Sequence, residues 1–384
     1  MRWLRLPLPR ARQSLPERKS SSLPVDVLHL NVTLRRPWWK KLVLPAIVVF
    51  LVVVTGALAA YLSYITTAYP SVVQASETTV VVTIPKGSSL GQIADILGEN
   101  QLVRNDIRFR ILARLSGLGT RLQAGEFLLP RGKKPREILS LLASAKPVSY
   151  AVTIPEGLTA QQIASLFADG GWCSKERFLE LVTDPQRIKA FGLSGATSLE
   201  GFLFPDTYLL TRDSSGAEVI VQRMLARFTE VWKELTVGLE PPPDVDRTVI
   251  LASIVEKETA VPQERARIAG VFLNRLEKGM RLQSDPTVIY GIKDYQGRIR
   301  KKDLQTPTPY NTYTLPGLPV GPICSPGRQA IDAVLRPAAT SSLYFVAKND
   351  GTHHFSESLA AHNRAVQKYQ RKKKQKKENG PPAL

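Results

Sequence analysis

A mostly apolar run extends over residues 42–66 and contains no charged side chain. A helix of this length, at about 1.5 Å per residue, crosses the roughly 30 Å hydrocarbon core of a bilayer. Aromatic residues lie at both ends of the run, as is typical of the membrane–water interface: Trp38, Trp39, Tyr61, Tyr64 and Tyr69. The pattern predicts one membrane-spanning helix over 42–66.

The charges on the two sides of this run differ. Glu77 is the first charged residue after it, whereas four basic residues precede it closely: Arg35, Arg36, Lys40 and Lys41. Because Lys and Arg are enriched on the cytoplasmic side of membrane helices, we expect the N-terminus inside the cell and the rest outside. The sequence thus predicts a basic cytoplasmic tail over 1–41, the anchor over 42–66 and a linker over 67–77.

Beyond the linker, the sequence repeats itself at an offset of 70 residues. Val-Thr-Ile-Pro-Lys-Gly at 82–87 recurs as Val-Thr-Ile-Pro-Glu-Gly at 152–157, and Gln-Ile-Ala follows five residues later in both copies. Each copy reads as a β-branched strand, a Pro-x-Gly turn and an amphipathic helix. We expect one such unit over 78–147 and a second, with a connecting region, over 148–243.

A buried helix is predicted after the prolines at 241–243. Residues 248–255 are apolar around most of the helical circumference, and Glu256 is the first carboxylate after them. Burial disfavours the charged form of a carboxyl group and so raises its pKa, as a general acid near neutral pH requires. Glu256 is therefore our candidate catalytic acid.

Three charged side chains near Glu256 leave an alternative open. Glu258 lies roughly 200° further round the helix, and Lys257 and Arg265 are close in sequence. Both glutamates could therefore be ion-paired at a helix end without any role in catalysis.

Three loops that follow are rich in Pro, Gly, Asn, Thr and Tyr, at 280–291, 306–313 and 317–327. Rigid turns with many hydroxyl and amide groups suit an elongated polar ligand such as a glycan, although ordinary turns would account for any one of them. The candidate ligand-binding residues, in these loops and elsewhere, are Ser253, Gln283, Asp285, Tyr290, Tyr310, Asn311, Tyr313, His354 and Asn363.

Composition excludes several other functions. The 384 residues include only two cysteines and four histidines, without a His-Glu-x-x-His motif, so we expect no metal and no cofactor. The formal net charge is +19, but much of the excess lies in residues 1–41 and in a basic tail over 367–384 that we expect to be flexible. We therefore expect no nucleic-acid binding.

Five motifs together resemble the MltG (YceG-like) family of endolytic murein transglycosylases: Leu199–Tyr208, Ala252–Thr259, Arg281–Gly291, Pro309–Tyr313 and Gly317–Pro319. The resemblance implies an α+β chain with a single N-terminal transmembrane helix, LysM-like βα modules and an α+β YceG-like catalytic domain over 244–366. It also implies that the essential residue is the first glutamate of the Glu-Lys-Glu-Thr run, Glu256.

The reaction implied by this resemblance cleaves the β-1,4 bond between N-acetylmuramic acid and N-acetylglucosamine of nascent peptidoglycan. Glu256 would protonate the glycosidic oxygen and then take the proton of the muramic C6 hydroxyl, which attacks C1 and leaves a 1,6-anhydro end. A lysozyme-like hydrolase would need a second carboxylate, for which Asp206 and Asp285 are candidates. A non-catalytic glycan-binding scaffold is a third possibility.

The resemblance also implies a location and partners. We expect a single-pass protein of the cell (inner) membrane with an extracytoplasmic catalytic domain. The implied partners are peptidoglycan strands and the wall-synthesis polymerases (penicillin-binding proteins), and cleavage would terminate the elongation of glycan strands.

Overall fold

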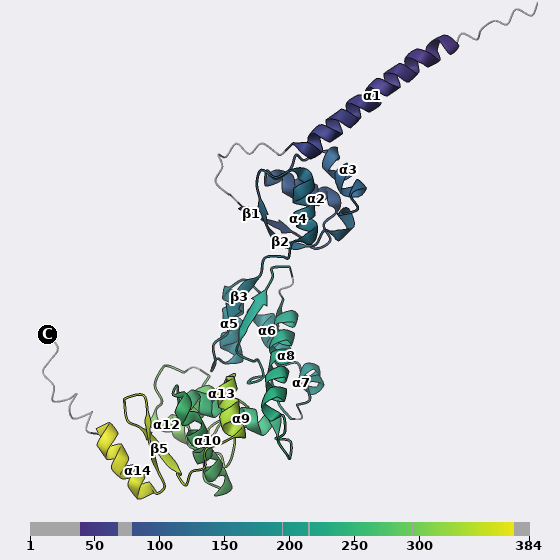
Figure 1. Ribbon diagram of the computed structural model, residues 1–384. Helices are drawn as coiled ribbons and strands as arrows, with labels where there is room; N and C mark the ends of the chain where they lie inside the picture. Colours follow the sequence, from purple (N-terminus) through teal and green to yellow (C-terminus); the bar gives the residue numbers. More distant parts are fainter. Residues whose placement is uncertain (1–38, 68–78, 194, 214–215, 294, 372–384) are drawn as a thin grey trace, which may run out of the picture. The chain divides into compact units, whose positions relative to one another are not determined.

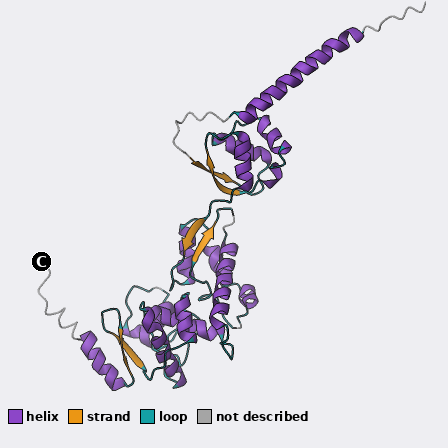
Figure 2. Cartoon of the chain, in the orientation of Figure 1, coloured by secondary structure: helices purple, strands orange, loops and turns teal. Residues whose placement is uncertain are grey.

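The computed structural model describes residues 39–67, 79–193, 195–213, 216–293 and 295–371, whose helices and strands are drawn in Figures 1 and 2. Most of the predicted basic tail over 1–41, nearly all of the predicted linker, and the C-terminal tail after residue 371 lie outside these residues. The chain divides into two compact bodies, one ending at Leu62 and the other starting at Ser63. Both repeats predicted from the sequence lie in the second body, and they are called the first and the second unit below.

Helix α1 (Lys40–Thr66) corresponds to the predicted apolar run. Its segment Lys41–Thr66 has a mean hydropathy of 2.8, and no part of the most apolar window is buried inside the protein. Among the described residues it is the one helix long and apolar enough to cross a membrane.

The repeat in the sequence is also a repeat in structure. Strand β1 (Thr79–Ile84) leads to α2 (Leu90–Glu99), and β3 (Tyr150–Thr153) leads to α5 (Ala160–Asp169). Both helices start with a capping box, Ser89 with Gln92 and Thr159 with Gln162, again 70 residues apart. In such a box the N-cap side chain and the residue three positions later satisfy each other's free backbone N–H groups.

The first unit continues with α3 (Ile107–Leu115), a 3₁₀ turn (Gly119–Arg121), β2 (Gly125–Pro130) and α4 (Pro135–Ser144). Strands β1 and β2 pair antiparallel. Alternate residues of both strands face the core, where Val82, Phe127 and Phe109 are fully buried.

The second unit continues with α6 (Lys175–Val182), α7 (Pro185–Phe191), β4 (Thr207–Leu210) and α8 (Ala217–Thr236). Strands β3 and β4 pair antiparallel. Its core includes Phe202 and Phe228, whose rings lie edge to face with centroids 5.1 Å apart.

The C-terminal part contains α9 (Val245–Glu258), α10 (Pro262–Glu277), α11 (Asp285–Gly291), α12 (Lys301–Gln305), α13 (Arg328–Leu335), β5 (Tyr344–Ala347), β6 (His353–Ser356) and α14 (Leu359–Val366), followed by a π-helical turn (Gln367–Arg371). Strands β5 and β6 form a third antiparallel pair. The described ranges thus mix helices with three two-stranded sheets, and the predicted α+β class is confirmed.

Helix α9 is apolar around its circumference because it packs against two cores. Val249 and Ala252 belong to the core of the second unit. On another side, Leu251 and Ile254 pack with Phe272 and other residues of the C-terminal part. The second unit and the C-terminal part therefore share α9, although the sequence predicts a boundary between them at residue 243.

Candidate active site

The last residue of α9, Glu258, lies at a polar cavity of 490 Å³. The cavity is bounded by the end of α9, the loop before α11, strands β5 and β6, and α14. Its polar lining consists of Glu258, Arg275, Gln283, Asp285, Tyr313, Tyr344, His353, His362 and Gln370. Three of the predicted ligand-binding residues, Gln283, Asp285 and Tyr313, thus meet here.

The carboxyl group of Glu258 has the protonation behaviour expected of a general acid. Burial raises the pKa of Glu258 to about 7, and the nearby Asp285 carboxylate adds to this increase. The Ser284 hydroxyl, which donates to Glu258 Oε1 at 2.5 Å, and the nearby His353 both oppose it. Glu258 therefore carries its proton for about half of the time at neutral pH.

Buried groups hold the polar lining in place. Arg275, on α10, donates from Nη1 to the Leu282 carbonyl at 2.9 Å and from Nη2 to Gln283 Oε1 at 2.8 Å. Burial lowers the pKa of Arg275. On the other side, the Tyr313 hydroxyl donates to Asp285 Oδ1 at 2.6 Å, so both side chains are fixed relative to each other.

His353, the first residue of β6, is held by a carboxylate from α10. Its backbone N–H donates to Glu264 Oε1 at 2.9 Å, and its ring Nδ1 lies 2.7 Å from Glu264 Oε2. Its neighbour His354, the histidine predicted from the sequence to bind ligand, instead has its ring centroid 5.7 Å from that of Tyr369. Neighbouring residues of a strand face opposite ways, so only one of the two histidines lines the cavity.

Glu256 is buried, as expected, but its surroundings are not apolar. Its side chain is only 7% exposed, but Arg265 Nη2 lies 3.2 Å from Oε1 and the Gly327 amide donates to Oε2 at 3.1 Å. Both donors stabilise a negatively charged carboxylate. The ion pair that the sequence left open as an alternative is therefore present for Glu256, whereas Glu258 has the raised pKa that was expected of Glu256.

Glu256 also lies at the Pro-x-Gly turn of the second unit. Arg265 Nη2 lies 3.8 Å from Glu156, and Lys257 donates to the Gly157 carbonyl at 3.2 Å. Burial and the nearby Glu256 raise the pKa of Glu156, while Arg265 lowers it. This end of α9 thus fastens the second unit to the C-terminal part.

Tyr290 and Tyr310 belong to a different buried cluster, around Glu200. The Tyr290 hydroxyl donates to Glu200 Oε2 at 3.1 Å, and the two tyrosine rings lie edge to face at 4.6 Å. The Ala160 amide also donates to Glu200, at 3.0 Å. Burial raises the pKa of Glu200 to about 7. Glu200 is not among the residues predicted from the sequence, although it lies in one of the five family motifs, Leu199–Tyr208.

The other predicted residues lie away from the cavity. Ser253 is fully buried; its hydroxyl donates to the Ile250 carbonyl and accepts from the Ile323 amide. Asn311 is also fully buried and donates to three carbonyls, including that of Thr306 at 2.7 Å. Asn363 is exposed on α14, where its neighbour His362 reaches the cavity. Ser253 and Asn311 therefore shape the loops instead of facing a ligand.

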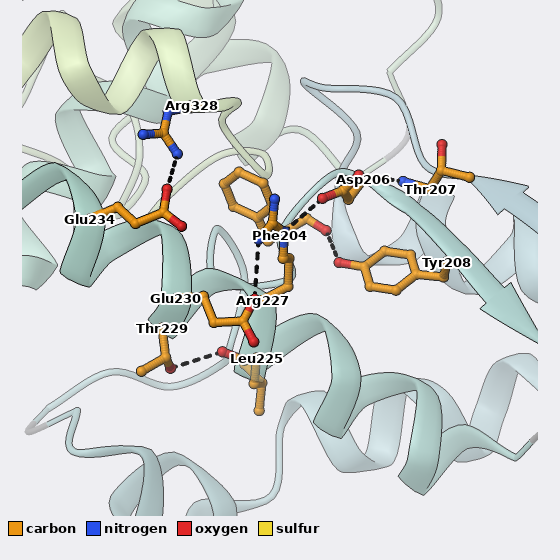
Figure 3. A network of polar contacts seen from close by, with 10 residues as sticks. All are labelled: Phe204, Asp206, Thr207, Tyr208, Leu225, Arg227, Thr229, Glu230, Glu234 and Arg328. Carbon is orange, nitrogen blue, oxygen red and sulfur yellow. Dashed lines mark hydrogen bonds and ion pairs between the residues drawn. The ribbon is translucent and has the colours of Figure 1, made fainter.

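Asp206, a candidate second carboxylate, is bound by a cation. Arg227 Nε donates to Asp206 Oδ2 at 2.7 Å, as Figure 3 shows. In the same view Arg328, on α13, donates to Glu234, on α8. Asp285, in contrast, lines the Glu258 cavity. No group of three or more His, Cys, Asp or Glu in the described part of the chain could hold a metal ion.

Comparison with known proteins places the chain in a family. The sequence model of the YceG-like family matches residues 82–368. The chain belongs to the YceG-like family. The family predicted from the five motifs is therefore confirmed.

Curated relatives and a solved structure agree with this membership. The endolytic murein transglycosylase of Bacillus subtilis (strain 168) is 34% identical over 318 residues, covering 78% of this chain and 88% of the relative. The one from Streptococcus pneumoniae serotype 2 is 31% identical over 323 residues, covering 75% of this chain but 58% of the relative. A crystal structure of a yceG-like protein from Listeria monocytogenes, 32% identical, aligns with a TM-score of 0.51 over 76% of this chain and 100% of that one.

Proposed function

We propose that this YceG-like protein is a lytic transglycosylase of peptidoglycan whose acid is Glu258. The relatives named endolytic murein transglycosylase support the reaction class. The observation that carries the assignment is the Glu258 carboxyl group, with a pKa near 7, at a cavity lined by polar side chains. A polar lining of amide, carboxyl, imidazole and phenol groups suits a sugar polymer.

Glu258 acts first as an acid. Its protonated carboxyl group donates to the oxygen of the β-1,4 bond between N-acetylmuramic acid and N-acetylglucosamine as the bond from C1 breaks. The muramic C6 hydroxyl attacks C1 and forms the 1,6-anhydro ring. The hydroxyl proton passes either to the carboxylate left on Glu258 or to another base in the cavity.

Glu256 has a structural task in this proposal. Its carboxylate pairs with Arg265 and with the Gly327 amide, beside the turn of the second unit. Both carboxylate oxygens already accept hydrogen bonds from the protein, as is typical of a group with a structural role. We therefore transfer the catalytic role predicted for Glu256 to the other glutamate of the same motif.

A hydrolase remains the second candidate because one observation favours it. Asp285 lines the same cavity as Glu258, so a second carboxylate is present, as a lysozyme-like reaction requires. The products distinguish the two reactions: a transglycosylase leaves 1,6-anhydro ends and a hydrolase leaves reducing ends.

We also propose that α1 anchors the protein in the cell membrane with the catalytic part outside. The length and hydropathy of α1 support the anchor, and the basic residues before it support the orientation. Cleavage beside the membrane would terminate the growth of new strands, next to the wall-synthesis polymerases. The first unit, predicted as LysM-like, would hold the glycan there.

The test compares two glutamine variants of the full chain on purified, uncross-linked glycan strands, with mass spectrometry of the ends. Glu258→Gln should lower the rate of formation of anhydro ends by about 10²–10⁴-fold, the usual contribution of a general acid. Glu256→Gln, the matched control, should keep activity within about tenfold in its folded fraction. Loss of activity in Glu256→Gln alone, with a normal thermal transition, would overturn the assignment.

A further inference from the structure

We propose that His353, oriented by Glu264, is the base that removes the proton of the attacking C6 hydroxyl, while Glu258 acts only as the acid. This inference rests on the proposed transglycosylase function and divides its acid and base steps between two residues. It differs from the reaction expected from the sequence, in which one glutamate performs both.

Two hydrogen bonds fix the position of His353. Both carboxylate oxygens of Glu264 are used, one by the His353 backbone N–H at 2.9 Å and one by ring Nδ1 at 2.7 Å. The side chain of His353 is 12% exposed and that of Glu264 is 14% exposed. The His353 ring also lies edge to face with Phe345 at 5.5 Å. Two contacts thus hold the ring and a third holds its backbone, which fixes the imidazole at the cavity that it lines.

The contact with Glu264 decides which ring nitrogen is free. A carboxylate only accepts hydrogen bonds, so Nδ1 must carry the proton in this pair. In the neutral ring Nε2 then has an unshared electron pair, and the side chain that carries it lines the cavity. When Nε2 takes a proton, the negative Glu264 stabilises the imidazolium, as the aspartate of a Ser-His-Asp triad does.

The charged and titratable groups around His353 also favour a proton acceptor. The charged and titratable groups that line the cavity or contact His353 directly are Glu258, Glu264, Asp285, Arg275, His362, Tyr313 and Tyr344. Glu258 and His353 influence each other electrostatically. The one permanent cation among them, Arg275, is directed to the Leu282 carbonyl and to Gln283. Burial and Arg275 lower the pKa of His362, which leaves that ring largely neutral.

The proton balance of the reaction closes with these two residues. The C1–O bond breaks and the Glu258 proton goes to the departing oxygen. The C6 oxygen forms the new bond to C1, and its proton goes to Nε2 of His353. After product release, one proton transfer through cavity water, from the imidazolium to the Glu258 carboxylate, restores both groups.

The experiment measures initial rates and pH–rate profiles of the full chain on uncross-linked glycan strands. The variants are His353→Gln and Glu264→Gln, and His354→Gln is the matched control on the opposite face of β6. A glutamine at 264 would donate to Nδ1 and force the proton onto Nε2, which removes the base without removing the ring. His353→Gln and Glu264→Gln should each lower kcat by about 10²-fold or more, with KM little changed.

The pH profile separates a base from a structural residue. A base that must be unprotonated gives the wild-type rate profile a limb at low pH, and the ionisation of Glu258 gives it a limb at high pH. His353→Gln should lose the low-pH limb, and His354→Gln should keep the whole profile. A His353→Gln variant that keeps the low-pH limb, or stays within threefold of the control, would overturn the proposal.

The design separates this inference from the proposed function. If the wild type makes no anhydro ends, or Glu258→Gln retains full activity, the proposed function itself fails. If both behave as proposed but the His353→Gln profile matches the control, only the base assignment fails. Should His353→Gln not fold, Glu264→Gln, which keeps the ring, decides the question.

Discussion

Replacing Glu258 by glutamine should make the protein more stable at alkaline pH, although it abolishes activity. The pKa of a free glutamate is 4.5, and that of Glu258 in the folded protein is about 7. The folded state therefore binds the proton more tightly than the unfolded state, and stability falls as the pH rises from 4.5 through 7. Above that range the folded protein bears the full cost of an ionised, desolvated carboxylate.

The magnitude follows from the two pKa values. A difference of about 2.5 units, at 1.36 kcal/mol per unit, sets an upper bound of about 3.4 kcal/mol. The solvent of the cavity reduces this cost, so we expect about 2 kcal/mol for Glu258→Gln at pH 8.5. The gain should vanish below pH 4.5, where the wild-type carboxyl group is protonated in both states. The glutamine oxygen can still accept the Ser284 hydrogen bond.

The assay compares the denaturant or thermal transition of the wild type, Glu258→Gln and Glu256→Gln at pH 4.5 and 8.5. Glu256→Gln is the control because it removes a carboxylate that is paired with Arg265 and Gly327. It should destabilise the protein at pH 8.5, since it leaves Arg265 buried with a weaker partner. The reasoning is refuted if the two variants change stability in the same direction at pH 8.5.

Three further predictions concern positions outside the cavity. Gly201→Ala should destabilise the protein by more than about 2 kcal/mol in denaturant titrations, because Gly201 has a φ of +85° and an added Cβ would lie 2.5 Å from Pro322 Cβ. Tyr290→Phe should cost about 1–2 kcal/mol, because it removes one donor to the buried Glu200 carboxyl group; the test is whether this cost exceeds that of Tyr295→Phe, at an exposed tyrosine. Arg328→Ala should change stability by less than about 1 kcal/mol, because its ion pair with Glu234 is half-exposed.

The sequence predicts the elements better than it predicts the site. The 70-residue repeat identifies β1, α2, β3 and α5, because local periodicity and capping determine them. The apolar run identifies α1 for a similar reason. The predicted boundary at residue 243, in contrast, could not show that α9 takes part in two cores, since packing partners distant in sequence leave no local pattern.

The choice between Glu256 and Glu258 shows where the sequence-based reasoning stops. The helical wheel correctly places the two carboxylates on different sides of α9, but it cannot show what each side meets. Glu256 accepts a hydrogen bond from Arg265, which lies nine residues later in the chain. Glu258 instead lines a cavity whose wall includes β5, β6 and α14, which follow about ninety residues later. The contact of His353 with Glu264, 89 residues earlier in the chain, likewise holds His353, and not His354, at the site.

The Glu-Lys-Glu run works because it lies at the C-terminal end of a helix. The last carbonyl groups of α9 place negative partial charge beside Glu258, the final helical residue, which further disfavours its ionised form. Lys257 is directed away, to the Gly157 carbonyl, and so does not neutralise that effect. Glu256, near the same helix end, accepts hydrogen bonds from the Arg265 guanidinium and the Gly327 amide. Two residues, roughly 200° round the helix, thus separate a carboxylate that holds two parts of the chain together from one that keeps its proton for chemistry.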